Sequence, residues 1–211
     1  MTLESSEPAW LTIARELQAL AQTGLAFSND PFDLQRFQRT RELAAQLMAL
    51  GSDASAEKIL GLFERDVGYT TPKIDVRGAA FIDENILLVQ EATDGLWTLP
   101  GGWADVNQSA AECVVREISE ESGFQARATK LVAVCDYRKS GHPPRRVDSI
   151  YKMFFLCDIT GGEARTSVET TGVAFFPHDQ LPPLSLGRIT AAQIERVFRH
   201  HRQRNLPTEF D

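Results

Sequence analysis

Three glutamates that lie close together in the sequence have the chemistry and the spacing of a metal site. Glu117, Glu120 and Glu121 occupy positions i, i+3 and i+4, so on a helix their carboxylates project from one face. Like charges at this spacing repel one another, and a bound divalent cation removes the repulsion. Because the ligands are hard oxygens, Mg²⁺ or Mn²⁺ is favoured over zinc. On an arbitrary helix, the more common explanation of three such glutamates is a solvated acidic face.

The residues around the glutamates favour the metal site over a solvated face. Ser109 and Glu112 have the spacing of a capping box, which predicts that a helix begins at Ala110, and Gly123 should end it. A Pro-Gly-Gly sequence at 100–102 precedes this helix, and glycines allow backbone groups to approach a ligand closely. A strand and a loop before the helix should place the glutamates at a cleft. We therefore expect the acidic helix to line a site.

The segment from Gly102 to Phe124 resembles the Nudix box. That motif is a glycine, five residues, a glutamate, seven residues and then Arg-Glu-aliphatic-x-Glu-Glu-x-Gly-aliphatic. Residues 116–124 match its second half, with phenylalanine in the last apolar position. The chain departs from the motif at Gln108, where the family carries glutamate, and at Asn107, where relatives usually carry glycine.

The change at Gln108 concerns the arginine of the motif. In the family, the glutamate at this position helps to orient that arginine, which is Arg116 here. Glu112 lies one helical turn before Arg116, so we expect it to substitute in part as a partner of the arginine. The three metal-ligand glutamates are intact, and we expect activity to persist at a reduced level.

The resemblance covers almost the whole chain and is to a Nudix subfamily with an N-terminal helical domain. The segments that carry it outside the motif are residues 68–77, 95–105, 151–157 and 175–185. This subfamily acts on nucleoside diphosphates linked to another group, such as ADP-ribose or CDP-choline. The resemblance implies attack of water on one phosphorus of the diphosphate, assisted by Mg²⁺ or Mn²⁺, to give two phosphomonoesters. It also implies a nucleotide-type small-molecule substrate and a homodimer.

The resemblance assigns roles to individual residues as well. The metal ligands that it implies are Glu117, Glu120, Glu121 and the carbonyl oxygen of Gly101. Arg116 would hold the glutamates in register. Glu169 precedes a late predicted strand, where several relatives carry the general base, and Glu120 is the alternative base. Without that role, Glu169 is an ordinary exposed loop glutamate.

Basic residues are concentrated in two stretches. Residues 138–146 are the natural contact for substrate phosphates, because arginine and lysine pair with phosphate oxygens; the alternative is solvated charge on a hairpin loop. Residues 188–204 are interpreted as the solvated face of a terminal helix. The residues that we expect to bind substrate are Arg77, Arg138, Lys139, His142, Arg145 and Lys152.

Residues 1–68 are predicted to form a helical domain. They show helical patterns over residues 8–23, 31–50 and 55–66 and no strand pattern. The apolar residues expected on the inner faces of these helices are Trp10, Ile13, Leu17, Leu20, Leu34, Phe37, Leu43, Leu47, Leu50, Ile59, Leu60, Leu62 and Phe63. Helices this few and short bury little core alone, so their apolar residues require a further surface, either the catalytic domain or a second copy of the chain.

Residues 69–211 are predicted to form the Nudix domain, an α/β/α sandwich with a mixed sheet. A hairpin is expected on either side of residues 83–85. Further strands are expected at 96–99, 129–137, 149–158 and 172–176, and helices at 110–122 and 189–203. The predicted fold class is therefore α+β, preceded by the helical domain.

The composition is that of a globular protein without a membrane or export segment. The 211 residues are 43% hydrophobic, and no apolar run approaches about 20 residues. Cys113, Cys135 and Cys157 have neither pairing nor metal spacing and are expected to be reduced, as in a cytoplasmic protein. The net charge of −7 argues against nucleic acid as a partner.

Two other functions use some of the same features. The first is a non-catalytic, nucleotide-sensing regulator with a Nudix fold; the intact glutamates argue against it, and Gln108 argues for it. The second is processing or exonuclease activity on RNA ends, which uses the same metal chemistry. It would need an aromatic and basic stripe that the sequence lacks.

Overall fold

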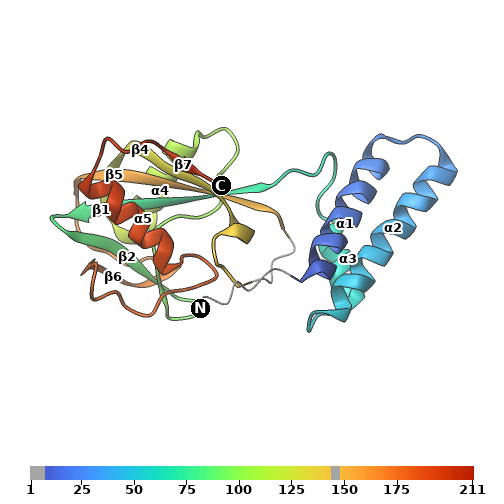
Figure 1. Ribbon diagram of the computed structural model, residues 1–211, viewed down its shortest axis with the longest axis horizontal. Helices are drawn as coiled ribbons and strands as arrows, with labels where there is room; N and C mark the ends of the chain where they lie inside the picture. Colours follow the sequence, from blue (N-terminus) through green and yellow to red (C-terminus); the bar gives the residue numbers. More distant parts are fainter. Residues whose placement is uncertain (1–7, 144–147) are drawn as a thin grey trace. The chain divides into compact units, whose positions relative to one another are not determined.

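The computed structural model describes residues 8–143 and 148–211 (Figure 1). These residues fall into two compact units: the first comprises the described residues up to Pro72 together with Asp148, and the second comprises Lys73–Pro143 and Ser149–Asp211. Among the described helices, none combines the length and the apolar surface that crossing a membrane requires.

The first unit consists of three helices, as the sequence predicts. They are α1 (Ala9–Phe27), α2 (Pro31–Leu50) and α3 (Ala56–Phe63). Helix α2 begins where the Asp30 side chain accepts two backbone hydrogen bonds, each of 2.9 Å, and Pro31 occupies the first turn. The side chain of Ser55 caps α3 in the same way. These caps fix where both helices begin.

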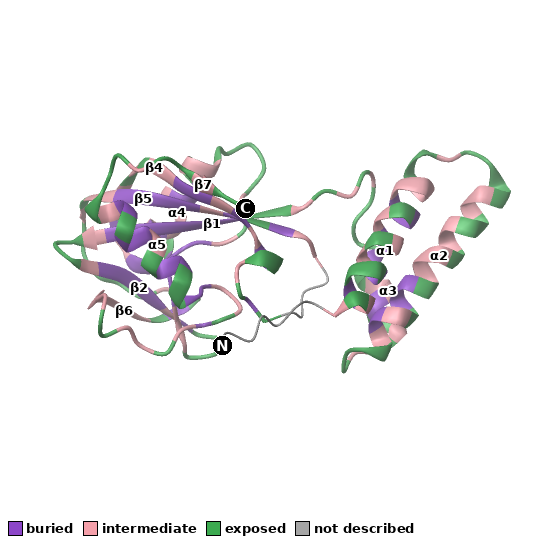
Figure 2. Ribbon diagram, viewed as in Figure 1, coloured by how far each residue is buried: buried purple, intermediate pink, exposed green. Residues whose placement is uncertain are grey.

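The buried stretches of these helices, coloured purple in Figure 2, carry smaller residues than the sequence pattern predicts. The buried apolar residues of the unit are Leu11, Ala14, Ala21, Ala44, Ala45, Met48, Ile59 and Phe63. Alanines on the facing sides allow α1 and α2 to approach closely, so the contact runs along small side chains. The predicted inner faces are therefore wrong in part, because several of their large side chains are between 42% and 86% exposed. These side chains are Ile13, Leu20, Leu43, Leu50 and Leu62.

The second unit is built on a mixed sheet, which confirms the predicted α+β class. Its strands are β1 (Lys73–Ile82), β2 (Asn85–Glu91), β3 (Trp97–Thr98), β4 (Phe124–Asp136), β5 (Ile150–Gly162), β6 (Thr170–Pro177) and β7 (Glu209–Phe210). Their order is β3-β2-β1-β5-β4-β7, and β6 also pairs with β2. The pairs β1–β5 and β4–β7 are parallel, and the other pairs are antiparallel. The paired ends of β4 and β5 extend beyond the predicted ranges along a bulged ladder.

One helix covers each face of this sheet (Figure 1). Helix α4 (Ala110–Ser122) shares a core cluster with Leu87 of β2. Helix α5 (Ala191–Arg202) shares the other core cluster with Leu88 of the same strand. Successive side chains of β2 thus point to opposite faces, as expected of a pleated strand, and both faces are buried.

A loop that leads into α4 lies along β1 on the side opposite β5. Residues 100–104 bond to β1 much as a strand would, and the shortest of these hydrogen bonds, 2.8 Å, joins the N–H of Val76 to the carbonyl of Gly102. Gly101 has a φ of 142°, and a Cβ at this position would lie 2.0 Å from the carbonyl oxygen of Val76. Only glycine permits this approach, which fixes the loop relative to the sheet.

Candidate active site

Helix α4 begins and ends as the sequence predicts. Its capping box is formed: the Ser109 side chain accepts from the N–H of Glu112 at 3.2 Å, and the Glu112 carboxylate accepts from the N–H of Ser109 at 2.8 Å. Gly123 ends the helix in the left-handed conformation, with a φ of 79°. The helix that carries the three glutamates is therefore fixed at both ends by local interactions.

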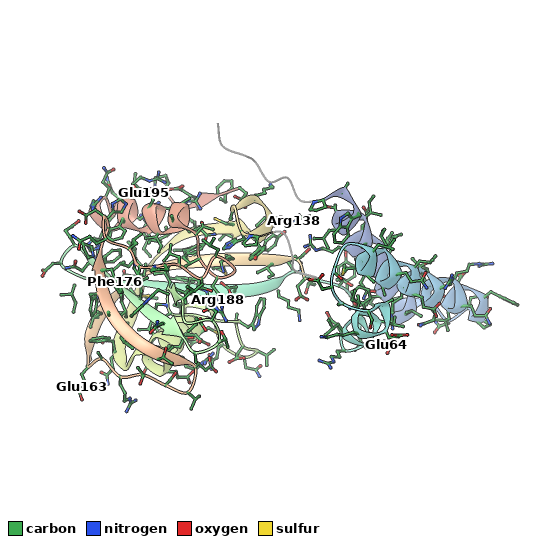
Figure 3. The ribbon with its side chains drawn as sticks, turned by 90° about the horizontal axis from the view of Figure 1, so that it is seen from below. Glu64, Arg138, Glu163, Phe176, Arg188 and Glu195 are labelled. Atoms are coloured by element: carbon green, nitrogen blue, oxygen red, sulfur yellow. The ribbon has the colours of Figure 1, made fainter. Side chains whose placement is uncertain are left out.

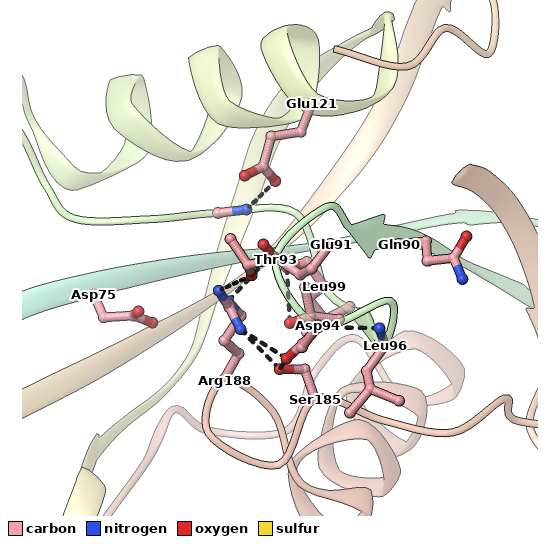
Figure 4. Close-up of polar contacts among 12 residues, drawn as sticks. Asp75, Gln90, Glu91, Thr93, Asp94, Leu96, Leu99, Glu121, Ser185 and Arg188 are labelled. Atoms are coloured by element: carbon pink, nitrogen blue, oxygen red, sulfur yellow. Dashed lines mark hydrogen bonds and ion pairs between the residues drawn. The ribbon is translucent and has the colours of Figure 1, made fainter. Parts of the chain in front are cut away.

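Glu121 is buried against the loop that enters the helix. It is 6% exposed, and its Oε2 accepts a hydrogen bond of 2.9 Å from the N–H of Gly101 (Figure 4). Burial raises the pKa of Glu121 to about 8, although the charge of Arg77 and the hydrogen bond from Gly101 act in the opposite direction. A bound cation would compensate the charge of this carboxylate.

Glu117 and Glu120 complete the acidic face of α4. The side chain of Glu117 is 12% exposed, and burial raises its pKa against the opposing charge of Arg116. A Cβ on Gly102 would lie 3.3 Å from Oε2 of Glu117, so the glycine keeps the loop close to this carboxylate. The side chain of Glu120 is 58% exposed. The acidic face thus runs from a buried end at Glu121 to solvent at Glu120.

The donor set fits a hard divalent cation. Three carboxylates and the neighbouring backbone of Gly101 offer oxygen ligands, which Mg²⁺ and Mn²⁺ prefer. Although the three glutamates share one helical face, no three acidic, histidine or cysteine side chains of the described residues, these included, are gathered in a group that could hold a metal ion. Arg116 bonds Glu117 and Glu120, while Glu121 bonds the loop. Burial raises the pKa values of Glu117 and Glu121, so a bound cation would stabilise the charged form of both carboxylates. The assignment of the metal ligands stays a prediction.

Arg116 contacts both the glutamates and the loop before the helix. Its acceptors are Gln108 Oε1 at 3.2 Å, Glu120 Oε2 at 2.6 Å, Asp105 Oδ2 at 2.8 Å and Glu117 Oε1 at 2.9 Å. The expectation that Glu112 would act as a partner of Arg116 is wrong, because the Glu112 carboxylate binds the backbone and hydroxyl groups of Ser109 instead. Asp105 is a partner that the motif does not predict.

Glu169, the predicted general base, lies beside the end of α4. Its carbonyl accepts from the N–H of Ala92 at 2.8 Å, and the hydroxyl of the next residue, Thr170, donates to the carbonyl of Glu121 at 2.8 Å. The side chain of Glu169 is exposed. The structure thus brings the loop of Glu169 next to the acidic helix, and its role as a base stays a prediction.

Arg77 and Lys152, which were expected to bind substrate, are buried together with Asp75. Lys152 lies opposite Asp75 on the neighbouring strand, with Nζ 2.6 Å from Oδ1, and Arg77 holds both oxygens of the same carboxylate at 2.8 to 2.9 Å. All three are at most 5% exposed. Burial would raise the pKa of Asp75, but the charges of Arg77 and Lys152 lower it to about 2. Arg77 also donates to the carbonyl of Leu99, so this ionic cluster holds the start of the 99–104 loop.

Over its described residues, 138–143, the basic loop does not form one cationic face. Arg138, which lies on the segment after β4 (Figure 3), is exposed and pairs with Asp136 at 2.7 Å. Lys139 is exposed, whereas His142 is buried and bonded to the carbonyl of Leu186. Arg145 lies outside the described residues. Of the six expected substrate contacts, Arg138 and Lys139 are therefore the ones that the structure places at an exposed surface.

A polar cluster around Arg188 was not predicted (Figure 4). Arg188 lies before α5, so its interpretation as part of the solvated face of the terminal helix is wrong. Its guanidinium group lies 3.0 Å from Glu91 and 3.1 Å from Asp94, and Asp94 also accepts from Ser185 at 2.8 Å. Burial raises the pKa of Glu91, and the charges of Arg188 and Arg77 oppose the rise. The only local signal in the sequence is that Glu91 ends a strand with an apolar centre at residues 86–89.

Two family patterns match the chain, one in each compact unit. The family described as "UDP-X-like, N-terminal oligomerisation domain" matches residues 8–63, and the family described as "NUDIX domain" matches residues 72–198. The second match alone covers more than half of the chain.

The chain is also similar to individual proteins over most of its length. It is 45% identical over 202 residues to "Putative ADP-ribose pyrophosphatase YjhB" of Bacillus subtilis (strain 168), covering 96% of this chain and 97% of that protein. The solved structure titled "Crystal structure of UDP-X diphosphatase" is 33% identical, with a TM-score of 0.62, and covers 96% of this chain and 98% of its own. An ADP-ribose pyrophosphatase structure from Streptococcus suis 89-1591 is 45% identical, with a TM-score of 0.62, and covers 67% of this chain and 100% of its own.

Proposed function

The chain belongs to the Nudix hydrolase family, and from this premise we propose that it is a Mg²⁺- or Mn²⁺-dependent pyrophosphohydrolase of nucleoside diphosphates linked to another group. The substrate would be of the ADP-ribose or CDP-choline type, and the products would be two phosphomonoesters. The observation that carries the proposal is the acidic face of α4, with Glu121 buried against the glycine loop at Gly101. Two similar solved structures, whose titles name an ADP-ribose pyrophosphatase and a UDP-X diphosphatase, support the substrate class.

Each residue of the site has a distinct task in this proposal. Glu117, Glu120 and Glu121 hold the cation with the carbonyl of Gly101, and the cation, when bound, neutralises phosphate charge and acidifies the attacking water. Arg116 keeps Glu117 and Glu120 in position through its two ion pairs. Glu169, which is exposed and precedes the residue that bonds to the last turn of α4, accepts the proton of the water, and Glu120 is the alternative.

The exposed cations Arg138 and Lys139 attract the diphosphate in this proposal. The buried pair of Arg77 and Lys152 acts indirectly, because both are occupied by Asp75 and Arg77 holds the carbonyl of Leu99. Their contribution is to keep the loop beneath the substrate rigid.

A substrate panel tests the proposal. ADP-ribose, CDP-choline, nucleotide sugars and a capped short RNA would be incubated with Mg²⁺ or Mn²⁺, and phosphate release would be read after phosphatase treatment. Hydrolysis in ¹⁸O-labelled water then identifies the phosphorus that is attacked. Turnover of the capped RNA alone would favour the RNA-end function, and no turnover with measurable nucleotide binding would favour the regulator.

We predict that Glu120→Gln and Glu121→Gln each lower turnover by at least ~100-fold, because each removes a ligand charge at the transition state. Millimolar Mg²⁺ should also raise the melting temperature of the wild type, since it relieves repulsion between the carboxylates. Steady-state kinetics and thermal melts measure both effects. Full activity in both variants would remove the acidic helix from the mechanism.

We also propose that the helical unit forms a homodimer. Large apolar side chains recur at seven-residue spacing on the outer surface of α1, where Ile13, Leu20 and Phe27 are 50%, 58% and 67% exposed. Residues seven apart lie on nearly the same face of a helix. Together with the match of this unit to a family described as an oligomerisation domain, the stripe supports a second copy of the chain as its partner.

A further inference from the structure

Arg116 has a charged partner outside the acidic face of the helix. Its Nη2 lies 2.8 Å from Oδ2 of Asp105, and its Nε donates to the uncharged Oε1 of Gln108 at 3.2 Å. Gln108 occupies the place of the glutamate in the motif. The hydrogen bond at that place is therefore retained, while the negative charge is supplied from a position three residues earlier.

The buried thiol of Cys113 ties both residues to the same helix. The N–H of Asp105 donates to Sγ of Cys113 at 3.3 Å, and this thiol donates to Oε1 of Gln108 at 3.4 Å. Between them, Asn107 adopts a left-handed conformation with a φ of 64°, which asparagine tolerates better than most residues. The turn and the thiol together hold Asp105 and Gln108 on the same guanidinium group.

We propose that Asp105 and Gln108 jointly replace the missing glutamate, with Asp105 supplying the charge that positions Arg116. Asp105 is thus a positioning residue, and the inference rests on the proposed function of the acidic helix. Arg116 also binds Glu117 and Glu120, which the cation requires. When Asp105 compensates part of the charge of Arg116, the arginine holds the two glutamates in register without competing fully with the cation for them.

Reciprocal substitution tests the inference, with Mn²⁺ as the probe. The proteins are the full-length wild type, Asp105→Asn, Gln108→Glu and the double variant Asp105→Asn/Gln108→Glu. The dissociation constant for Mn²⁺ is read from the electron paramagnetic resonance signal of the free ion, independently of turnover. Asp105→Asn should weaken Mn²⁺ binding and lower kcat by about 10-fold or more, as expected for an outer-shell partner. The double variant should regain most of both losses, because Gln108→Glu restores the charge from the motif position.

Glu84→Gln is the matched control. The Glu84 side chain is 63% exposed, against 62% for that of Asp105. Glu84 forms an ion pair of 2.9 Å with Arg202, and neither residue belongs to the acidic helix. This variant should bind Mn²⁺ as the wild type does. Melting temperatures without metal show whether each variant is folded, and recovery in the double variant excludes a folding defect as the cause.

The outcomes separate the inference from the proposed function. Wild-type Mn²⁺ binding in Asp105→Asn, or a double variant no better than Asp105→Asn, would overturn the role of Asp105 and leave the metal site standing. If Gln108→Glu strengthens Mn²⁺ binding more in the Asp105→Asn variant than in the wild type, the role of Asp105 is supported. Failure of the wild type to bind Mn²⁺ would refute the proposed function, and the inference with it.

Discussion

The surroundings of His142 determine what this residue can do. His142 is 5% exposed, and its ring stacks on Tyr137 with the two centroids 4.2 Å apart. The carbonyl of Leu186 only accepts, so Nδ1 of His142 carries the hydrogen and Nε2 accepts from the side chain of Gln193. Burial lowers the pKa of His142 to about 4, and the ring is therefore neutral at pH 7. A neutral, fully bonded ring packs the loop and does not attract phosphate.

We predict that His142 makes folding sensitive to acid. The folded protein protonates this ring with a pKa of about 4, whereas the unfolded chain protonates it near the ordinary value of 6.5. Its contribution to stability is therefore complete above pH 6.5 and is lost as the pH falls from 6.5 to 4. His142→Gln, which still donates and accepts, should be less stable at pH 7 but should lose less stability on acidification.

Melting temperatures of both proteins between pH 7 and pH 4, measured in EDTA, test this prediction. The opposite titration of Glu121, whose pKa is raised, occurs in both proteins and cancels in the comparison. Parallel curves for the two proteins would show that His142 does not carry the effect.

At the level of single residues, the sequence predicts what is local. The acidic face of α4 depends only on spacing within one helix, so Glu117, Glu120 and Glu121 could be placed on one helical face in advance. The burial of Arg77 and Lys152 depends on parallel pairing of β1 with β5, which local periodicity does not encode. For that reason two cations expected at the surface belong to an ionic cluster inside the domain.

At the level of elements, the loop that enters α4 is the part of the fold on which the site depends most. Gly101 approaches β1 so closely that a Cβ would meet both the carbonyl oxygen of Val76 at 2.0 Å and the Cα of Arg77 at 2.9 Å. Both contacts are with backbone, which cannot rotate away as a side chain does. The same glycine donates its N–H to Glu121.

We predict that Gly101→Ala separates the loop from β1, with a loss of at least about 2 kcal/mol in the free energy of unfolding from strain and clash. Metal-dependent activity should fall with it, because the loop supports Glu121. Gly95→Ala is the matched control, since Gly95 has a φ of 69° but no atoms near the added Cβ, and should lose only about 1–2 kcal/mol. Urea denaturation measures both, and equal losses would show that the approach to β1 is unimportant.

Helix starts were predicted more accurately than helix faces, for a physical reason. A start depends on a capping side chain within a few residues, such as Asp30 or Ser109, whereas α1 continues to Phe27 beyond its predicted end near residue 23. A buried face depends on the partner helix, and α1 and α2 meet through small residues such as Ala14 and Ala44. Hydrophobic periodicity marks where large apolar residues lie, but it does not say which of two apolar stripes another helix will cover.

At the level of the whole molecule, the wrongly predicted inner faces of α1 and α2 are informative about assembly. On α2, Phe32, Leu43 and Leu50 are 67%, 45% and 86% exposed, and their separations of 11 and 7 residues again place them on nearly one helical face. Two exposed apolar stripes on adjacent helices exceed what a monomer usually leaves in water. The helical unit therefore buries small residues such as Ala14 and Ala44 and leaves several large apolar side chains exposed on α1 and α2, as an association surface requires.

We predict that the full-length protein is a dimer and that Leu20→Glu dissociates it. Leu20 is 58% exposed, so the glutamate should be tolerated by the fold of one chain but would place charge in the middle of the stripe on α1. Light scattering at micromolar concentration should give about twice 23.5 kDa for the wild type and one chain mass for the variant. Ile82→Glu, at a 45% exposed position in the second unit, is the control and should remain dimeric. A wild-type mass of one chain would exclude the dimer, whereas a dimeric Leu20→Glu would move the interface to the stripe on α2 and require the same test at Leu43.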